Sequence, residues 1–378
     1  MKIAALIYKF FPYGGVQLDF LRILEECHSR GHEIIVYAHR WEGERPNYID
    51  LHLLPLKRSS NHGRMMEFGK KCKGLIDKQD FDLVFSVNRL PGLDVYFAGD
   101  TCYAAKSHRE RSFFYRWLPR YKVYKKLEKS VFARENGCNI MLLLSSQQVD
   151  YEKYYQTEPE RFIVLPPGIP ADRCRPDNAE DIRMQKRSEL GVDKDEIMIL
   201  QIGSGFVTKG VERSIRAVAS LPAAWRGRIH FFVVGSDKPE KFIKLAKKLG
   251  VGERVAFLGG RNDVPGLLLA ADMMLHPAIN DATATVLAEA IVAGLPVLCT
   301  AACGFSQLIK SARSGVVLPE PFEQKELNHQ LDHMLETPIQ LQAYQDNAIL
   351  YANDTDFFNR QRVAVDFMEQ VAEEKANQ

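Results

Sequence analysis

The sequence has few cysteines, and their positions form no paired pattern. Its 378 residues include seven Cys, scattered along the chain. Cys299 and Cys303 are four residues apart, but no cluster of His or carboxylate residues surrounds them. This distribution excludes a disulfide framework and a cysteine zinc site, and it favours a reduced, cytoplasmic protein with small buried thiols.

Long hydrophobic runs are also absent. No stretch approaches the roughly 18 apolar residues of a membrane span, so the sequence predicts no transmembrane helix. The N-terminal stretch "MKIAALIYKFFPYGG" has a short apolar run, but Lys9 interrupts it and no small-residue cleavage site follows. It is more typical of a buried strand that enters a glycine-rich turn than of a signal peptide.

The chain has little net charge, but that charge is unevenly distributed. The formal net charge is +2, whereas residues 106–129 contain nine Lys and Arg against two Glu. Six aromatic residues are interleaved with these cations. The combination favours an anionic membrane surface as a local partner rather than nucleic acid. The alternative is a basic surface helix that packs its aromatic rings inward.

Apolar strand patterns alternate with helical patterns through both halves of the chain. This alternation predicts an α/β protein with parallel sheets and right-handed crossovers, in two Rossmann-like domains. Residues 162–177 carry four prolines and a glycine and are the predicted linker. The predicted domains are therefore residues 1–168 and 169–354, followed by a C-terminal helix within 355–378.

Loops that follow the strands are the candidate sites, because ligands bind at the carboxyl ends of parallel sheets. In the loop 10–19, Gly14 and Gly15 would let backbone N–H groups approach a phosphate at a helix N-terminus. Asp19 lies one turn into that helix and would face the ligand. The alternative is a plain tight turn, since the loop is not a G-x-G-x-x-G motif.

A second glycine-rich loop follows the first strand of the second half. Gly203 and Ser204 belong to a flexible loop, and Lys209 stands just before the next helix. A lysine in this place can neutralise a pyrophosphate as charge moves to the leaving group. The spacing is not that of a Walker A motif, and the alternative is a solvated lysine on a turn.

Two further loops carry candidate residues. Arg261 precedes Asn262 and Asp263, a pair that is typical of a helix N-cap. Residues 282–285 begin an apolar helix whose free N–H groups and positive dipole end favour an anion. Asp281 precedes this helix, and Glu289 lies two turns into it, where a buried glutamate needs a partner such as a ribose diol. The alternative is an N-cap aspartate and a salt-bridged glutamate.

Taken together, the loops resemble a known family. "FPYGGVQLD", "GSGFVTKG", "GGRNDV" and "HPAINDATATVLAEA" resemble retaining glycosyltransferases of the GT-B fold, family 4, and the last motif resembles that family's E-x7-E element. "NHGR", "PGLDVYFAGD", "YYQTEPERF", "LPPGI" and "CGF" resemble more closely the bacterial lipopolysaccharide core glucosyltransferases of the WaaG type. The resemblance extends from about residue 2 to residue 370.

This resemblance implies two Rossmann-like domains whose sheets face each other across a cleft. Residues 1–168 would be the acceptor- and membrane-facing domain, residues 169–354 would bind the nucleotide sugar, and the helix within 355–378 would pack back on the first domain. The enzyme would be peripheral to the cytoplasmic face of the inner membrane, bound to anionic lipid through residues 106–129. It would move a hexose, glucose by default, from a UDP-sugar to a heptose of the lipopolysaccharide inner core, with retention.

The resemblance also implies roles for individual residues, without a metal. Cationic side chains would stabilise the leaving diphosphate, and the leaving phosphate would take the acceptor's proton. The implied catalytic residues are Asp19, Arg173, Lys209 and Asp281. The implied donor-binding residues are Gly14, Gly15, Gly203, Ser204, Arg261, Asn262, Ala282, Thr283, Ala284, Thr285 and Glu289, with Arg261 at the uracil and Glu289 at the ribose.

The chain departs from the family pattern before the helix that carries Glu289. It has Asp281 where relatives have Glu, Ala284 where they have Gly, and Ile279 where they usually have Tyr. The shorter carboxylate is withdrawn by about 1.5 Å, and an offset near 1 Å can cost about 100-fold in rate. Another UDP-hexose, such as an N-acetylhexosamine, is therefore an alternative donor. A non-catalytic nucleotide-sugar-binding relative and, with less support, a GT-B epimerase are alternative functions.

Overall fold

The computed structural model describes residues 1–12 and 14–377, which form two compact units. Unit 1 comprises Met1–Gly168 and Asn359–Gln378, and unit 2 comprises Ile169–Phe358. Unit 2 thus extends four residues beyond the position that the sequence indicated. The reason is that Phe357 is fully buried and its carbonyl accepts a hydrogen bond from the Ile169 amide at 2.8 Å.

Over the described residues, unit 1 contains a seven-stranded parallel sheet in the order β3-β2-β1-β4-β5-β6-β7. Its strands are β1 (Lys2–Phe10), β2 (Glu33–Trp41), β3 (Ile49–Leu53), β4 (Leu83–Ser86), β5 (Val95–Ala98), β6 (Asn139–Leu142) and β7 (Phe162–Val164). Its helices are α1 (Gly15–Ser29), α2 (Asn61–Ile76), α3 (Tyr103–Glu110), η1 (Phe113–Trp117), α4 (Pro119–Phe132), α5 (Ser146–Tyr155), η2 (Pro159–Arg161) and α15 (Arg360–Ala376).

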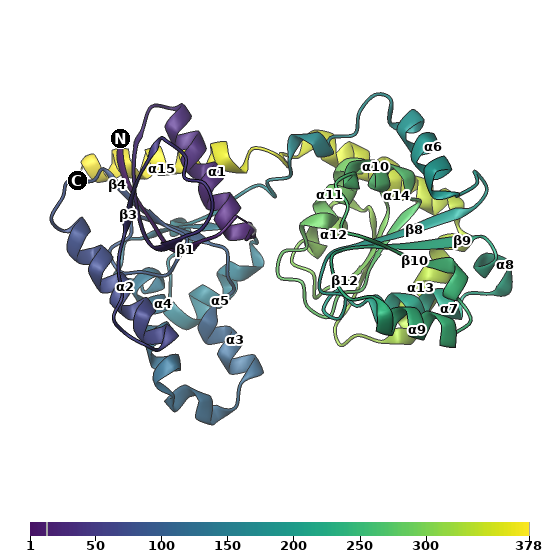
Figure 1. The fold of residues 1–378 in the computed structure, drawn as a ribbon, viewed down its shortest axis with the longest axis horizontal. Helices are drawn as coiled ribbons and strands as arrows, with labels where there is room; N and C mark the ends of the chain where they lie inside the picture. Colours follow the sequence, from purple (N-terminus) through teal and green to yellow (C-terminus); the bar gives the residue numbers. More distant parts are fainter. Residues whose placement is uncertain (13, 378) are drawn as a thin grey trace. The chain divides into compact units, whose positions relative to one another are not determined.

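Helices cover both faces of this sheet, because its strands are buried on both sides. One apolar cluster joins the sheet to α1 and α15, and a second joins the opposite face to α2, α4 and α5. Helices α1 and α15 lie side by side although they are at opposite ends of the chain (Figure 1). Helix α15 begins at Arg360 rather than at residue 355, and residue 378 of the expected helix lies outside the described residues.

Unit 2, over its described residues, contains a six-stranded parallel sheet in the order β10-β9-β8-β11-β12-β13. Its strands are β8 (Ile197–Ile202), β9 (Ile229–Val234), β10 (Val255–Gly259), β11 (Met273–His276), β12 (Val297–Thr300) and β13 (Gly315–Leu318). Its helices are η3 (Ala171–Arg173), α6 (Ala179–Leu190), α7 (Val211–Ser220), α8 (Ala223–Arg226), α9 (Glu240–Lys248), η4 (Gly252–Arg254), α10 (Val264–Ala270), α11 (Thr285–Ala293), α12 (Ser306–Ala312), α13 (Gln324–Glu336) and α14 (Pro338–Asp354).

The chain order of unit 2 reverses between two neighbouring strands at the centre of its sheet. Strand β8 pairs with β9 on one side and with β11 on the other. Strands β9 and β10 therefore extend the sheet toward one edge, and β11 to β13 extend it toward the other edge. Such a switch point opens a crevice at the carboxyl ends of the strands. The two parallel sheets confirm the predicted α/β fold class, and the switch point indicates a candidate site in unit 2.

Candidate active site

The loops that follow β8 and β11 are bonded to each other. The Ile279 amide donates to the Thr208 carbonyl at 2.8 Å. Gly210, at the start of α7, has φ +73°, and a Cβ there would lie 2.0 Å from the Pro277 carbonyl oxygen. Only glycine fits at this contact, because both the backbone conformation and the space exclude a side chain. The close approach of the two loops brings their polar side chains together.

A lysine–carboxylate–histidine cluster forms where these loops meet. The Lys209 Nζ lies 2.6 Å from Asp281 Oδ2, and His276 Nε2 lies 3.0 Å from the same oxygen. The Ala284 amide donates to Asp281 Oδ1 at 3.1 Å. Burial alone would raise the pKa of Asp281, but the hydrogen bonds of His276 and Lys209 outweigh it and hold the pKa below its ordinary value. Asp281 is therefore an ionised, buried carboxylate at neutral pH.

His276 is the member of this cluster that sequence reasoning missed. It is the last residue of β11 and is fully buried. Within the described part of the chain its Nδ1 atom has no hydrogen-bond partner. In the sequence the His-Pro pair indicates only the end of a strand. The signal for a contact was the spacing of five residues between His276 and Asp281, at the start of a candidate phosphate loop.

Helix α11 begins beside Asp281. Ala284, at the N-cap position, has φ +55° and ψ +52°, the left-handed conformation that disfavours residues with a Cβ. Ala282 and Thr285 are exposed and Thr283 is half-buried, so this end of the helix faces solvent. The first N–H groups of a helix have no partner within the helix and carry its positive dipole end. They can therefore bind an anion next to Lys209.

Glu289 lies further along α11 and faces Arg173 at the end of η3. The distance from Arg173 Nε to Glu289 Oε2 is 3.8 Å. Burial raises the pKa of Glu289, and the charge of Arg173 offsets this only in part. Among the described residues, Arg173 Nε and Nη1 are buried without a hydrogen-bond partner. A buried guanidinium with free donors is ready for an acceptor such as a phosphate or a sugar hydroxyl.

The glycine-rich loop after β8 lies next to Lys209. Gly203 has φ +138°, and a Cβ there would lie 3.3 Å from the Lys209 Cε. The Ser204 hydroxyl accepts a hydrogen bond from the Ser236 amide at 3.0 Å, which fixes this loop to the end of β9. Both residues thus lie at the carboxyl edge, where the sequence predicted donor contacts.

Arg261 and Asn262 lie in the loop after β10, and Arg261 has an ionic partner. Its guanidinium bonds to Asp263 at 2.7 and 2.5 Å. The bonds of Arg261 and of Lys186 hold the pKa of Asp263 well below its ordinary value, although burial opposes this. Asp263 occupies the N-cap position of α10, but its side chain makes no capping bond within the described residues. Its carboxylate serves the two cations instead.

The N-terminal candidates belong to unit 1. Gly14 is the N-cap of α1 and Gly15 its first residue. Asp19 is buried, and both of its oxygens accept from Arg360 Nη1, at 3.0 and 2.9 Å. Arg360 Nε also donates to the Pro166 carbonyl at 3.0 Å. In this structure Asp19 therefore binds the first residue of α15, Arg360. The two residues are 341 positions apart, so the local sequence around Asp19 does not indicate this contact.

The basic segment 106–129 contains both exposed and buried aromatic rings. Phe114 and Trp117 in η1 are 76% and 70% exposed, whereas Tyr121 in α4 is buried. Glu128, fully buried on α4, accepts hydrogen bonds from the first amides of α3 and from the Tyr155 hydroxyl. The segment is thus fixed to the core at its base and presents aromatic rings at its tip.

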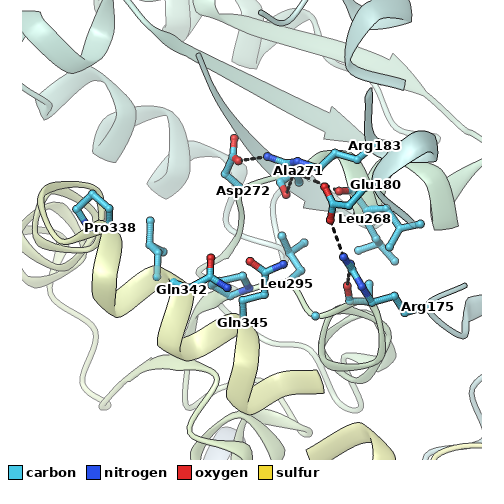
Figure 2. Close-up of a pocket in the computed structure, with 15 residues that line it drawn as sticks. Arg175, Glu180, Arg183, Leu268, Ala271, Asp272, Leu295, Pro338, Gln342 and Gln345 are labelled. Carbon is cyan, nitrogen blue, oxygen red and sulfur yellow. Dashed lines mark hydrogen bonds and ion pairs between the residues drawn. The ribbon is translucent and has the colours of Figure 1, made fainter. Parts of the chain in front are cut away.

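A cavity of about 430 Å³ lies elsewhere in unit 2 (Figure 2). It borders Asp272, which precedes β11, so it lies at the opposite end of that strand from His276. Its two arginines have partners: Arg183 donates to the last carbonyls of α10, and Arg175 donates to Ala293 at the end of α11. Figure 2 shows Arg183 paired with Asp272 and Arg175 paired with Glu180. These cations stabilise helix C-termini and differ from Arg173, whose Nε and Nη1 have no hydrogen-bond partner among the described residues.

Two kinds of feature are absent from the described part of the chain. None of the helices in residues 1–12 and 14–377 combines the length and hydropathy of a membrane span. The same residues contain no group of three or more His, Cys, Asp or Glu placed to hold a metal ion.

Comparisons with known proteins agree with this architecture. Residues 13–173 match the family model "Glycosyltransferase Family 4", and residues 182–351 match "Glycosyl transferases group 1". The chain is 44% identical over 369 residues to the lipopolysaccharide glucosyltransferase WaaG of Escherichia coli (strain K12), covering 97% of this chain and 98% of that protein. The crystal structure of WaaG superposes with a TM-score of 0.82, covering 97% of this chain and 99% of that one. Anabaena HepE in complex with UDP and glucose shares the fold over the full length of both chains, with a TM-score of 0.68 at 19% identity.

The two parallel-sheet units and the two family models together define the class as a GT-B glycosyltransferase. Within that class, the chain belongs to the family of the lipopolysaccharide glucosyltransferase WaaG.

Proposed function

We propose that this protein transfers a hexose, glucose by default, from a UDP-sugar to a heptose of the lipopolysaccharide inner core, with retention at the anomeric carbon. The relative with which it shares 44% identity over nearly the whole of both chains is a lipopolysaccharide glucosyltransferase. The observation that carries the proposal is the site itself: Lys209 lies beside the N-terminus of α11 at the switch point of the sheet. This arrangement of a cation and free amides suits a diphosphate.

Departure of UDP would be the step that these residues accelerate. As the bond between the sugar and the diphosphate breaks, negative charge builds up on the phosphate, and oxocarbenium character develops on the sugar. Lys209, the α11 amides and the free donors of Arg173 would stabilise the phosphate charge without reorganising. The acceptor hydroxyl would attack the same face of the sugar, and the leaving phosphate would take its proton. Glu289 would bind the ribose and Arg261 the uracil.

A metal is not needed in this proposal, because Lys209 and Arg173 supply the positive charge that a divalent cation would supply.

We also assign Asp281 to the donor sugar. Its carboxylate is ionised and fixed by three partners, so it can accept a hydrogen bond from a sugar hydroxyl in a defined place. Asp281 is one methylene shorter than the glutamate of relatives, so its carboxylate lies further from the sugar. A sugar with a larger substituent at that position would close the gap, and another UDP-hexose is therefore an alternative donor.

The partner of residues 106–129 would be the anionic cytoplasmic face of the inner membrane. Exposed Phe113, Phe114 and Trp117 support this proposal, since large exposed rings beside Arg and Lys suit the lipid headgroup region. Arg116 lies 5.4 Å from the centre of the Phe113 ring, so cation and ring are presented together. A peripheral enzyme held in this way would meet a lipid-linked acceptor.

An assay of donor turnover tests the proposal. The protein is incubated with UDP-glucose, UDP-galactose or UDP-N-acetylglucosamine and a lipopolysaccharide core that ends in heptose. We expect UDP release that depends on the acceptor, and an acceptor whose mass increases by one residue of the sugar that is transferred. If the protein binds UDP but forms no UDP from any of these donors, the result would contradict the proposed function and favour a non-catalytic relative.

A further inference from the structure

His276 makes a contact that the reaction described above does not use. Its Nε2 lies 3.0 Å from Asp281 Oδ2, the same oxygen that Lys209 approaches to 2.6 Å. An ionised carboxylate can only accept hydrogen bonds, so Nε2 is the donor. Two donors therefore share one carboxylate oxygen, and only one of them has to leave it for the diphosphate to bind.

The surroundings of His276 leave it little freedom to move. The residue is fully buried, and the Cys303 Sγ lies 3.7 Å from its carbonyl oxygen. Within the described residues Nδ1 has no partner, so the contact of Nε2 with Asp281 is the one hydrogen bond that the ring makes there. The ring therefore donates from Nε2 to Asp281.

Binding of a diphosphate changes the partners of Asp281. Lys209 is paired with Asp281 in the structure, whereas in the proposed complex it contacts phosphate. After that exchange the buried carboxylate keeps, of its partners within the protein, only His276 and the Ala284 amide. A buried charge that loses its partners is strongly unfavourable. The contact with His276 reduces this cost.

We infer that His276 is a positioning residue which, by compensating Asp281, allows Lys209 to move from the carboxylate to the diphosphate of the donor. This inference rests on the proposed function. It predicts that His276 affects nucleotide affinity through Lys209, although its own ring is buried beneath Asp281 and has no access to the nucleotide.

The test compares UDP dissociation constants, measured by calorimetry, among variants of His276. His276→Phe keeps a ring of similar size and removes the donor, whereas His276→Gln keeps an amide donor near the position of Nε2. Loss of a hydrogen bond to a charged group corresponds to roughly a 10- to 100-fold change. We expect His276→Phe to weaken UDP binding about tenfold and His276→Gln to stay within about threefold of the wild type. His276→Asn, which is too short to reach Asp281, should resemble Phe and provides the comparison if the Phe variant does not fold.

Two controls separate this role from a general effect on the fold. His230 pairs with Glu196 at 2.9 Å in the same unit, near the start of β9, so His230→Phe should leave UDP affinity unchanged. In a Lys209→Met background, His276→Phe should cause no further loss, because no lysine remains to be released. An equal loss in both backgrounds, or unchanged affinity in both the Phe and Asn variants, would overturn the inference. A wild-type protein that does not bind UDP would overturn the proposed function as well.

Discussion

Replacing Ala284 by glycine tests the most unusual backbone conformation in the site. Ala284 has φ +55° and is buried, and its amide holds Asp281. A residue with a Cβ in the left-handed region costs about 1–2 kcal/mol. Ala284→Gly removes that cost. It also increases the conformational entropy of the unfolded chain, which destabilises the fold by about 0.4–1 kcal/mol. The loss of one buried methyl group destabilises it by up to about 0.8 kcal/mol more. We expect these effects nearly to cancel, so that stability stays within about 0.5 kcal/mol of the wild type.

Ala288→Gly is the matched control, because Ala288 is also buried on α11 but lies in the interior of a right-handed helix. Both substitutions delete a buried methyl and loosen the unfolded chain, so their difference isolates the left-handed conformation. Ala288→Gly should be less stable than Ala284→Gly by about 1–2 kcal/mol. In thermal denaturation this corresponds to roughly 2–4 °C for each kcal/mol in a unit of this size. Equal losses of Tm in the two variants would refute the argument. Calorimetry should also show that Ala284→Gly binds UDP severalfold more tightly, because the amides of α11 become more accessible.

Four further outcomes are expected. Lys209→Met should weaken UDP binding about 100-fold in calorimetry, since a charge-assisted contact is lost, and Lys209→Arg should recover part of it; unchanged affinity would contradict the diphosphate role. The pKa of Glu289 is higher in the folded protein than in the unfolded chain. Ionisation of Glu289 therefore lowers the free energy of unfolding as the pH rises above the ordinary carboxylate pKa. Glu289→Gln should therefore raise Tm at pH 8 but not at pH 4, and a gain at both pH values would contradict this assignment. The double substitution Phe114→Glu and Trp117→Ser should abolish sedimentation with vesicles that contain anionic lipid while preserving UDP binding; retained sedimentation would count against the membrane proposal. Turnover should persist in excess EDTA, and its loss would show that the side-chain cations are insufficient.

The fold was largely predictable because parallel strands buried on both faces leave continuous apolar runs in the sequence. Strands such as β1, β8 and β9 show this pattern, and the structure confirms the two parallel sheets. Strands β3 and β5 do not follow the alternation of strand and helix patterns. β3 is an edge strand whose residues are mostly exposed, so it produces no clear hydrophobic period. β5 is buried but follows β4 without an intervening helix, so it breaks the alternation of strand and helix.

The candidate site was predictable as a set of loops but not as a set of contacts. Glycine positions and a helix start indicated where a phosphate would bind. The cluster of Lys209, Asp281 and His276 depends on the pairing of β8 with β11, which are separated by two other strands in the sequence. The partner of Asp19 comes from α15 at the other end of the chain, so tertiary structure alone revealed it.

The most direct test of the account is a crystal structure of the protein with UDP-glucose bound. We predict that the diphosphate oxygens lie within hydrogen-bond distance of Lys209 Nζ and of the first amides of α11, while Asp281 keeps its contact with His276. A structure in which Lys209 remains on Asp281 and the diphosphate binds elsewhere would contradict the account.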